Sequence, residues 1–342
     1  MSSPQVQDPH ALNRNQTHLD PDAPPPLPDL PPVEAPSAGF VVQLFVIPAV
    51  VVAVVIVVWL LFGKLAGGER DAMEYVRQLR LSSANWRSAF ELASLIQNDA
   101  RLGSDPKLLG ELTDLLSHEL DHNEDPRLTQ YVALTLGAFQ TLEASLADGR
   151  KVDPIDSLAR ALEPKFETPI RIAAAASLAK QAARLQGKLE DPRGVSALAQ
   201  AAAGDDPELR QMAVYALGFF GGEAASQALR DRITGDEDRY VRYNAAVALG
   251  RRGDMSAKGT LSEMLSTTAL DRVIELPSKS EKQSRIEAIE LEALQAIHSS
   301  LSGASPELAQ SLRPEIEGLS RSGLADIRSE ALELLKKLPT TP

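Results

Sequence analysis

One short segment of this sequence has the residue types and spacing of a metal centre. His118, Glu119 and His122 form an H-E-x-x-H pattern, in which two histidines one helical turn apart bind zinc and the glutamate acts as a general base. Glu143 is a candidate third ligand. Membrane-bound peptidases that use zinc carry this pattern, so metal-assisted peptide hydrolysis is the enzymatic function that these residues offer.

Three neighbouring features count against that chemistry. Asp121 is charged on a side of the helix that packs inward in zinc peptidases, and Glu124 stands where a small or apolar residue is needed. The segment 123–126 reads as a loop, so the pattern falls at the end of a helix. We therefore interpret these residues as a solvated, polar helix end and expect no catalytic residue, metal or cofactor.

Composition excludes several other functional classes. The chain carries 35 basic and 47 acidic residues, a formal charge of −12, whereas binding to nucleic acid depends on Lys and Arg that displace counterions. It has no cysteine, which excludes thiol catalysis and disulfides. The sequence shows no Gly-rich phosphate loop, no Ser/His/Asp pattern and no evident site for a small-molecule substrate.

The elements around these residues repeat along the chain. Residues 206–218 and 238–250 share Asp, Arg, Ala, Ala, Leu and Gly in register, and weaker copies begin at Asp125 and Glu167. Each unit reads as two helices, the first opened by a Pro with a capping Asp or Ser before it. The recurrent Ala allows neighbouring helices to approach closely, and Gly after Leu suits a helix end.

These segments resemble HEAT repeats in their bacterial form, in which the second helix reads xDxxVRxxAAxALGxxG. The resemblance implies an all-α fold, an α-solenoid of about seven stacked helix pairs over residues 71–338, with an insertion near 269–284. The layout is also similar to a group of bacterial membrane-anchored HEAT-repeat proteins. Such proteins are scaffolds for protein partners and share no catalytic residue, so the resemblance names no partner.

An apolar segment precedes the repeats. Residues 40–62 contain no charged side chain and would form a helix about 34 Å long, against a hydrocarbon core of about 30 Å. This length predicts one transmembrane helix, joined to the repeats by a short linker at 63–70. The tail before it, residues 1–39, is rich in Pro and is predicted to be disordered or extended.

Basic residues flank this segment on one side only. Lys64, Arg70, Arg77 and Arg80 follow it, whereas Arg14 is the nearest basic residue before it. The positive-inside rule then predicts a single-pass protein of the cell (inner) membrane, with the tail outside and the repeats in the cytoplasm.

A binding surface follows from projecting each second helix away from its Ala/Leu packing side. The projection gives one shallow apolar strip with amide and phenol rims, suited to a peptide or an amphipathic helix. A shift of one residue in register would instead bury some of these side chains between repeats. The strip consists of Gln130, Leu134, Ile172, Gln211, Tyr215, Tyr243 and Val247.

Taken together, these patterns favour a non-catalytic scaffold or adaptor that is tethered to a membrane and binds protein partners. The alternative is a membrane metallopeptidase that uses residues 118–122. Neither the partner, nor the process served, nor the oligomeric state, nor a ligand for the Pro-rich tail follows from the sequence.

Overall fold

The computed structural model describes residues 52, 55, 56, 72–81, 86–122, 125–301 and 306–338. The chain divides into two compact units, 1–68 and 69–342, and the architecture below is that of the second. In the described part of this unit the backbone forms helices joined by loops, with an isolated β-bridge between Ser145 and Lys151. The prediction of an all-α fold is therefore confirmed.

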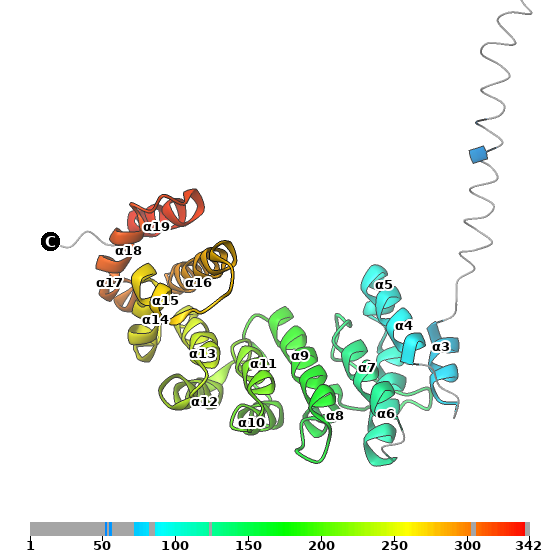
Figure 1. The fold of residues 1–342 in the computed structure, drawn as a ribbon. Helices are drawn as coiled ribbons and strands as arrows, with labels where there is room; N and C mark the ends of the chain where they lie inside the picture. Colours follow the sequence, from blue (N-terminus) through cyan, green and yellow to red (C-terminus); the bar gives the residue numbers. More distant parts are fainter. Residues whose placement is uncertain are drawn as a thin grey trace, which may run out of the picture. The chain divides into compact units, whose positions relative to one another are not determined.

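The helices of this unit pair into two layers, labelled along the chain in Figure 1. The first helices of the pairs are α3 (Ala72–Leu79), α6 (Pro106–His122), α8 (Pro154–Ala161), α10 (Pro192–Ala201), α12 (Gly222–Gly235), α14 (Lys258–Met264) and α18 (Arg313–Leu319). The second helices are α4 (Trp86–Asn98), α7 (Pro126–Leu136), α9 (Thr168–Arg184), α11 (Pro207–Leu217), α13 (Arg239–Arg251), α16 (Lys279–Ser300) and α19 (Ala325–Lys337). Each second helix packs against its own first helix and against the next second helix along the chain. This stacking is that of an α-solenoid.

Shorter elements interrupt the regular alternation. They are α5 (Ala100–Gly103), the 3₁₀ helix η2 (Met255–Ala257), α15 (Thr267–Val273) and α17 (Glu307–Ser311). The residues at 269–284, where the sequence predicts an insertion, comprise most of α15, a loop and the start of α16. Helix α15 packs against both α14 and α16.

Aspartate caps and prolines set where the helices begin. The Asp153 carboxylate accepts hydrogen bonds from the backbone N–H groups of Ile155 and Asp156 at the start of α8, and Asp191 does the same at α10. In both helices a proline occupies the first turn, where its missing N–H costs no hydrogen bond. Asp125 caps the second helix α7 in the same way, whereas Glu167 before α9 makes no side-chain capping hydrogen bond.

Small residues allow the second helices to approach closely, and two of the recurrent glycines end their helices as expected. Gly137 and Gly218 end α7 and α11 with φ of −70° and −59°, both ordinary right-handed values. A Cβ on Gly137 would lie 2.7 Å from Ser177 Oγ on α9, and one on Gly218 would lie 3.0 Å from Ala248 Cβ on α13. The glycines therefore make room for the next helix rather than form a left-handed cap.

The predicted membrane localisation requires correction. Among the residues that the structure describes, no helix is long and apolar enough to cross a membrane, so the prediction of a cell-membrane protein with its tail outside is not upheld. The segment on which that prediction rested, 40–62, lies outside the described residues apart from Val52, Val55 and Ile56. The predicted tail, 1–39, and linker, 63–70, also lie outside them.

Candidate protein-binding face

The outward side of the second helices, here called the second-helix face, carries part of the predicted strip. Gln130 and Leu134 on α7 and Ile172 on α9 are half-buried. Tyr215 on α11 is 48 % exposed. The Nε2 group of Gln211 donates to Asp238 Oδ2 at 2.9 Å, so this amide joins α11 to the N-terminus of α13. The strip is therefore accessible along α7, α9 and α11.

On α13 the predicted strip is wrong, because its two residues are buried. Tyr243 is only 3 % exposed and Val247 only 7 %. The Tyr243 hydroxyl donates to Glu263 Oε1 on α14 at 2.6 Å, and burial together with this carboxylate raises the pKa of Tyr243 above its ordinary value. Helices α14 and α16 both pack on α13, so these positions form contacts between repeats.

Aromatic side chains mark the second-helix face more clearly than the predicted strip does. Among the described residues, every aromatic that is not buried lies on a second helix or directly after one. Trp86 of α4 stacks on Tyr131 of α7 with ring centroids 4.8 Å apart, and Phe90, 61 % exposed, meets Tyr131 edge-on at 6.4 Å. The set comprises Trp86, Phe90, Tyr131, Tyr215, Phe219 and Tyr240.

A second aromatic group follows at α11. Tyr215 contacts Phe219 edge-on at 5.0 Å, one helical turn away on the same side. The predicted strip does not include Trp86, Phe90, Tyr131, Phe219 or Tyr240. Their signal was present in composition, because aromatics make up only 4 % of the chain and these lie off the recurrent Ala and Leu positions.

An arginine at the end of α9 fastens this second helix to the one before it, α7. At the end of α9, Arg184 donates to the carbonyl oxygens of Gly137, at 2.9 Å, and of Phe139. These carbonyls follow α7, and they are among the groups that a helix leaves without internal partners at its end. Burial of the guanidinium lowers the pKa of Arg184. The face is therefore fixed to the repeat stack by charged hydrogen bonds.

The repeated Arg of the second helices is also structural. Arg210 is buried and pairs with buried Asp236, with 3.1 Å between Nε and Oδ2. Its Nη1 also donates to the Asp205 carbonyl oxygen at 2.9 Å. Arg242 likewise donates to the carbonyl oxygen of Asp236 at 2.7 Å. These arginines hold the loops before α11 and α13 and present no reactive group to solvent.

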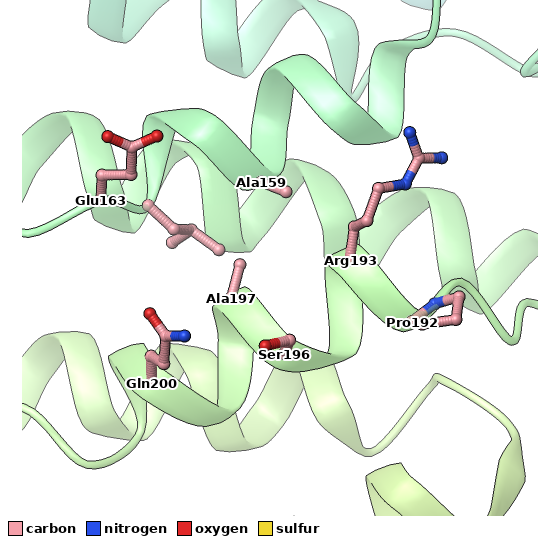
Figure 2. A pocket seen from close by; sticks show the side chains of 8 residues that line it. Ala159, Glu163, Pro192, Arg193, Ser196, Ala197 and Gln200 are labelled. Atoms are coloured by element: carbon pink, nitrogen blue, oxygen red, sulfur yellow. The ribbon is translucent and has the colours of Figure 1, made fainter.

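A groove lies on the other layer, between the first helices α8 and α10. It encloses about 310 Å³ and has an apolar floor, with Glu163 and Arg193 at opposite ends (Figure 2). Arg193 contacts Asp153 at 2.5 Å and Asp191 at 2.9 Å, and these hydrogen bonds raise the pKa of Arg193. Its charge is thus already matched within the chain. The lining is Ala159, Leu162, Glu163, Pro192, Arg193, Ser196, Ala197 and Gln200.

The H-E-x-x-H residues occupy the last turn of α6, as predicted for a helix end. The rings of His118 and His122 stack with centroids 4.1 Å apart, and His122 Nδ1 is 2.8 Å from the His118 carbonyl oxygen. Glu119 is buried, and Glu143 lies exposed in the loop after α7. Within the described ranges, no three His, Cys, Asp or Glu side chains are grouped to hold a metal ion, so Glu143 does not complete a site.

Comparison with known proteins identifies the repeats. The family of HEAT repeats matches residues 155–250 and 195–276. The archaeal HEAT-like repeats protein from Thermococcus onnurineus NA1 is 14 % identical, with a TM-score of 0.43 over 78 % of this chain and 97 % of that one. An engineered protein is 17 % identical, with a TM-score of 0.47 over 80 % of this chain and 69 % of that one.

A designed armadillo repeat protein is also similar, at 14 % identity and a TM-score of 0.36, over 78 % of this chain and 99 % of that one. No curated protein sequence matches the chain. These structural likenesses are distant, so the assignment rests on the family match, which coincides with the regular helix pairs from α8 to α14. Residues 155–276 therefore match the family of HEAT repeats.

Proposed function

We propose that the chain is a non-catalytic scaffold or adaptor, whose HEAT-repeat domain at 71–338 binds protein partners through the second-helix face. The observation that carries this proposal is the confinement of the non-buried aromatic side chains, within the described part of the chain, to that one layer. Aromatic side chains supply much of the binding energy of protein interfaces, because they bury large areas with few rotatable bonds.

The shape of this surface favours a peptide or a helix over a small molecule. The aromatics that are not buried are spread along α4, α7, α11 and α13, whereas a small-molecule site gathers a few polar groups in one enclosed cavity. Tyr215 is 48 % exposed and Phe90 is 61 % exposed. A linear segment lying across several second helices would cover such a row, as helices and extended peptides do in grooves of other proteins.

Partner capture by the full-length chain tests this proposal. Proteins crosslinked to the wild type would be compared with those crosslinked to Tyr215→Ala and Phe90→Ala, which shorten exposed side chains without opening the core. We expect both variants to lose the same partners. Met255→Ala is the matched control, since Met255 is 45 % exposed on η2, outside the second helices. An unchanged partner list in both variants would reject this face.

A further inference from the structure

A histidine joins the last two second helices, α16 and α19. His298 lies in the last turn of α16, and its side chain is 22 % exposed. Its Nδ1 atom is 2.6 Å from Glu330 Oε1, and its Nε2 atom is 2.5 Å from Lys337 Nζ. Glu330 and Lys337 lie two turns apart on α19, so one imidazole ring contacts this helix at two points.

The two contacts fix the protonation state of the ring. An ammonium group carries only N–H donors, so Nε2 of His298 accepts a hydrogen bond from Lys337 through its lone pair. The ring proton therefore lies on Nδ1, which donates to the Glu330 carboxylate. This is the neutral form of the imidazole. A second proton, on Nε2, would place two positive charges 2.5 Å apart, and like charges at that distance repel each other.

Within the described part of the chain, Glu330 and Lys337 are the charged groups that bond with this ring. Helices α13, α14, α15 and α17 also pack on α16. Residues 302–305, between α16 and α17, contain no ionisable group. The other charged side chains on these helices, on α16 and on α19 bond elsewhere or are exposed. They include Arg251, Glu263, Asp271, Glu292, Glu307 and Glu333.

Lys337 lies in the final turn of α19. The residue after it, Leu338, is buried, and its N–H donates to the Leu334 carbonyl oxygen at 3.2 Å. Helix α19 packs on α16 and α18. In a repeat array each unit is stabilised by its neighbours, and an end unit has a neighbour on one side only. A contact between α19 and α16 therefore has a large influence on whether this turn stays docked.

We propose that His298 makes the docking of the last turn of α19 sensitive to pH. While the imidazole is neutral, Lys337 bonds with Nε2 and the turn is held on α16. When the ring takes up a proton, Lys337 moves into solvent, the contact with Glu330 becomes charge-assisted, and the turn that carries Leu338 loosens. Histidine is the side-chain type that changes charge between pH 5 and 8. This device is independent of the second-helix face and of its partners.

Hydrogen exchange of the full-length chain at pH 8 and pH 5.5, corrected for the intrinsic exchange rates, tests the inference. The measured quantity is the protection of residues 334–338 relative to that of residues 241–249 on α13, which cancels changes in global stability. We expect this ratio to fall by about two-fold to five-fold at pH 5.5, the effect of losing one partly exposed charged contact.

Three variants assign the effect to this contact. Lys337→Met should give the low protection ratio at both pH values. In His298→Gln the amide retains an acceptor for Lys337 and a donor for Glu330 but does not titrate, so the ratio should be the same at both pH values. Lys336→Met removes the neighbouring exposed charge and should behave as the wild type. Circular dichroism verifies that the helices of each variant are intact.

Three results would overturn the inference. The first is a wild-type protection ratio that is equal at pH 8 and pH 5.5. The second is a fall in His298→Gln as large as that in the wild type, because another group would then cause it. The third is a full pH response in Lys337→Met. None of these results bears on partner capture, which decides the proposed function separately.

Discussion

Arg252, just after α13, donates a hydrogen bond to the carbonyl oxygen of Phe220, just after α11, at a distance of 2.6 Å. The same guanidinium reaches the Leu217 carbonyl oxygen at 3.1 Å and Ser226 Oγ at 2.6 Å. It repeats, two helix pairs later, the contact that Arg184 makes with the end of α7. Removing it would leave buried carbonyl oxygens without their charged donor.

We therefore expect Arg252→Met to lower the free energy of unfolding by about 2–3 kcal/mol, since hydrogen bonds to charged groups contribute more than neutral ones. Thermal unfolding followed by circular dichroism measures the loss. Arg251→Met is the matched control, because the adjacent Arg251 is exposed and its guanidinium lies over the Phe219 ring. Equal stability of the two variants would show that the carbonyl contacts contribute little.

Gly137 offers a test of helix spacing. We expect Gly137→Ala to destabilise the protein by about 1–3 kcal/mol, because the added methyl overlaps Ser177 on α9. Gly235→Ala, at the end of α12, places its methyl in open space and should be neutral or stabilising by up to about 1 kcal/mol. Denaturant titration of both variants compares them. A stable Gly137→Ala protein would mean that α7 and α9 can separate slightly without loss.

The buried hydroxyl of Tyr243 should make the stability of the fold sensitive to alkaline pH. Its pKa is raised in the folded state from an ordinary value of 10.0, so the folded protein holds this proton more tightly than the unfolded chain does. The resulting stabilisation is fully present below about pH 10 and is lost as pH rises toward the folded-state pKa. Stability of the wild type should thus fall above pH 10 more steeply than that of Tyr243→Phe.

Tyr243→Phe should also cost about 1–2 kcal/mol at neutral pH, because Glu263 loses its hydroxyl donor. Tyr215→Phe is the control, since the Tyr215 side chain is exposed on α11. Denaturant titrations at neutral and alkaline pH measure both effects. Identical alkaline curves for wild type and Tyr243→Phe would contradict the assignment.

The sequence was sufficient for features that depend on local or repeated patterns. The Asp and Pro signals at Asp153 and Asp191 locate helix starts, because capping involves only nearby backbone groups. The repeated Ala and Leu positions locate the side of each second helix that packs inward, because this side also follows from a local pattern. The period of the helix then places Tyr215 outward without any knowledge of its neighbours.

The sequence was insufficient where burial depends on distant elements. Tyr243 holds the same register position as Gln211, which is half-buried on α11. The helix pair that follows α13 departs from the regular repeat, because η2, α14 and α15 precede its second helix, α16. Glu263 of α14 then accepts a hydrogen bond from the Tyr243 hydroxyl and covers this side chain. Gly137 shows a similar limit, because its pattern resembles a helix-ending glycine while its actual constraint is Ser177 on another helix.

The H-E-x-x-H segment predicts a negative result for metal removal. His118 and His122 lie at the end of α6, and the described part of the chain provides no third ligand beside them. We expect EDTA to leave the thermal midpoint unchanged and His118→Ala to leave the metal content of the purified chain unchanged. Stoichiometric zinc that is lost in His118→Ala would restore the metallopeptidase hypothesis.

The burial of Glu290 leads us to expect that one substitution stabilises the protein. Its side chain is almost fully buried on α16, and burial raises its pKa from the ordinary value of 4.5, although the Thr267 hydroxyl donates to it and opposes the shift. Below pH 4.5 the folded and unfolded forms both hold the proton. As pH rises, the unfolded chain releases this proton first, so the stability contributed by protonated Glu290 is lost through the folded-state pKa.

At neutral pH the buried carboxylate is therefore unfavourable relative to a neutral group of the same shape. Glu290→Gln retains an oxygen that can accept from Thr267 and removes the charge, as well as its repulsion by Glu287. We expect this variant to be more stable than the wild type at pH 7 to 8, with the difference shrinking toward pH 4.5. Glu292→Gln, on the exposed side of α16, serves as the control. Denaturant titrations across this pH range measure the difference in stability. If Glu290→Gln is less stable than the wild type at pH 8, the carboxylate is held by stronger favourable contacts than Thr267 alone.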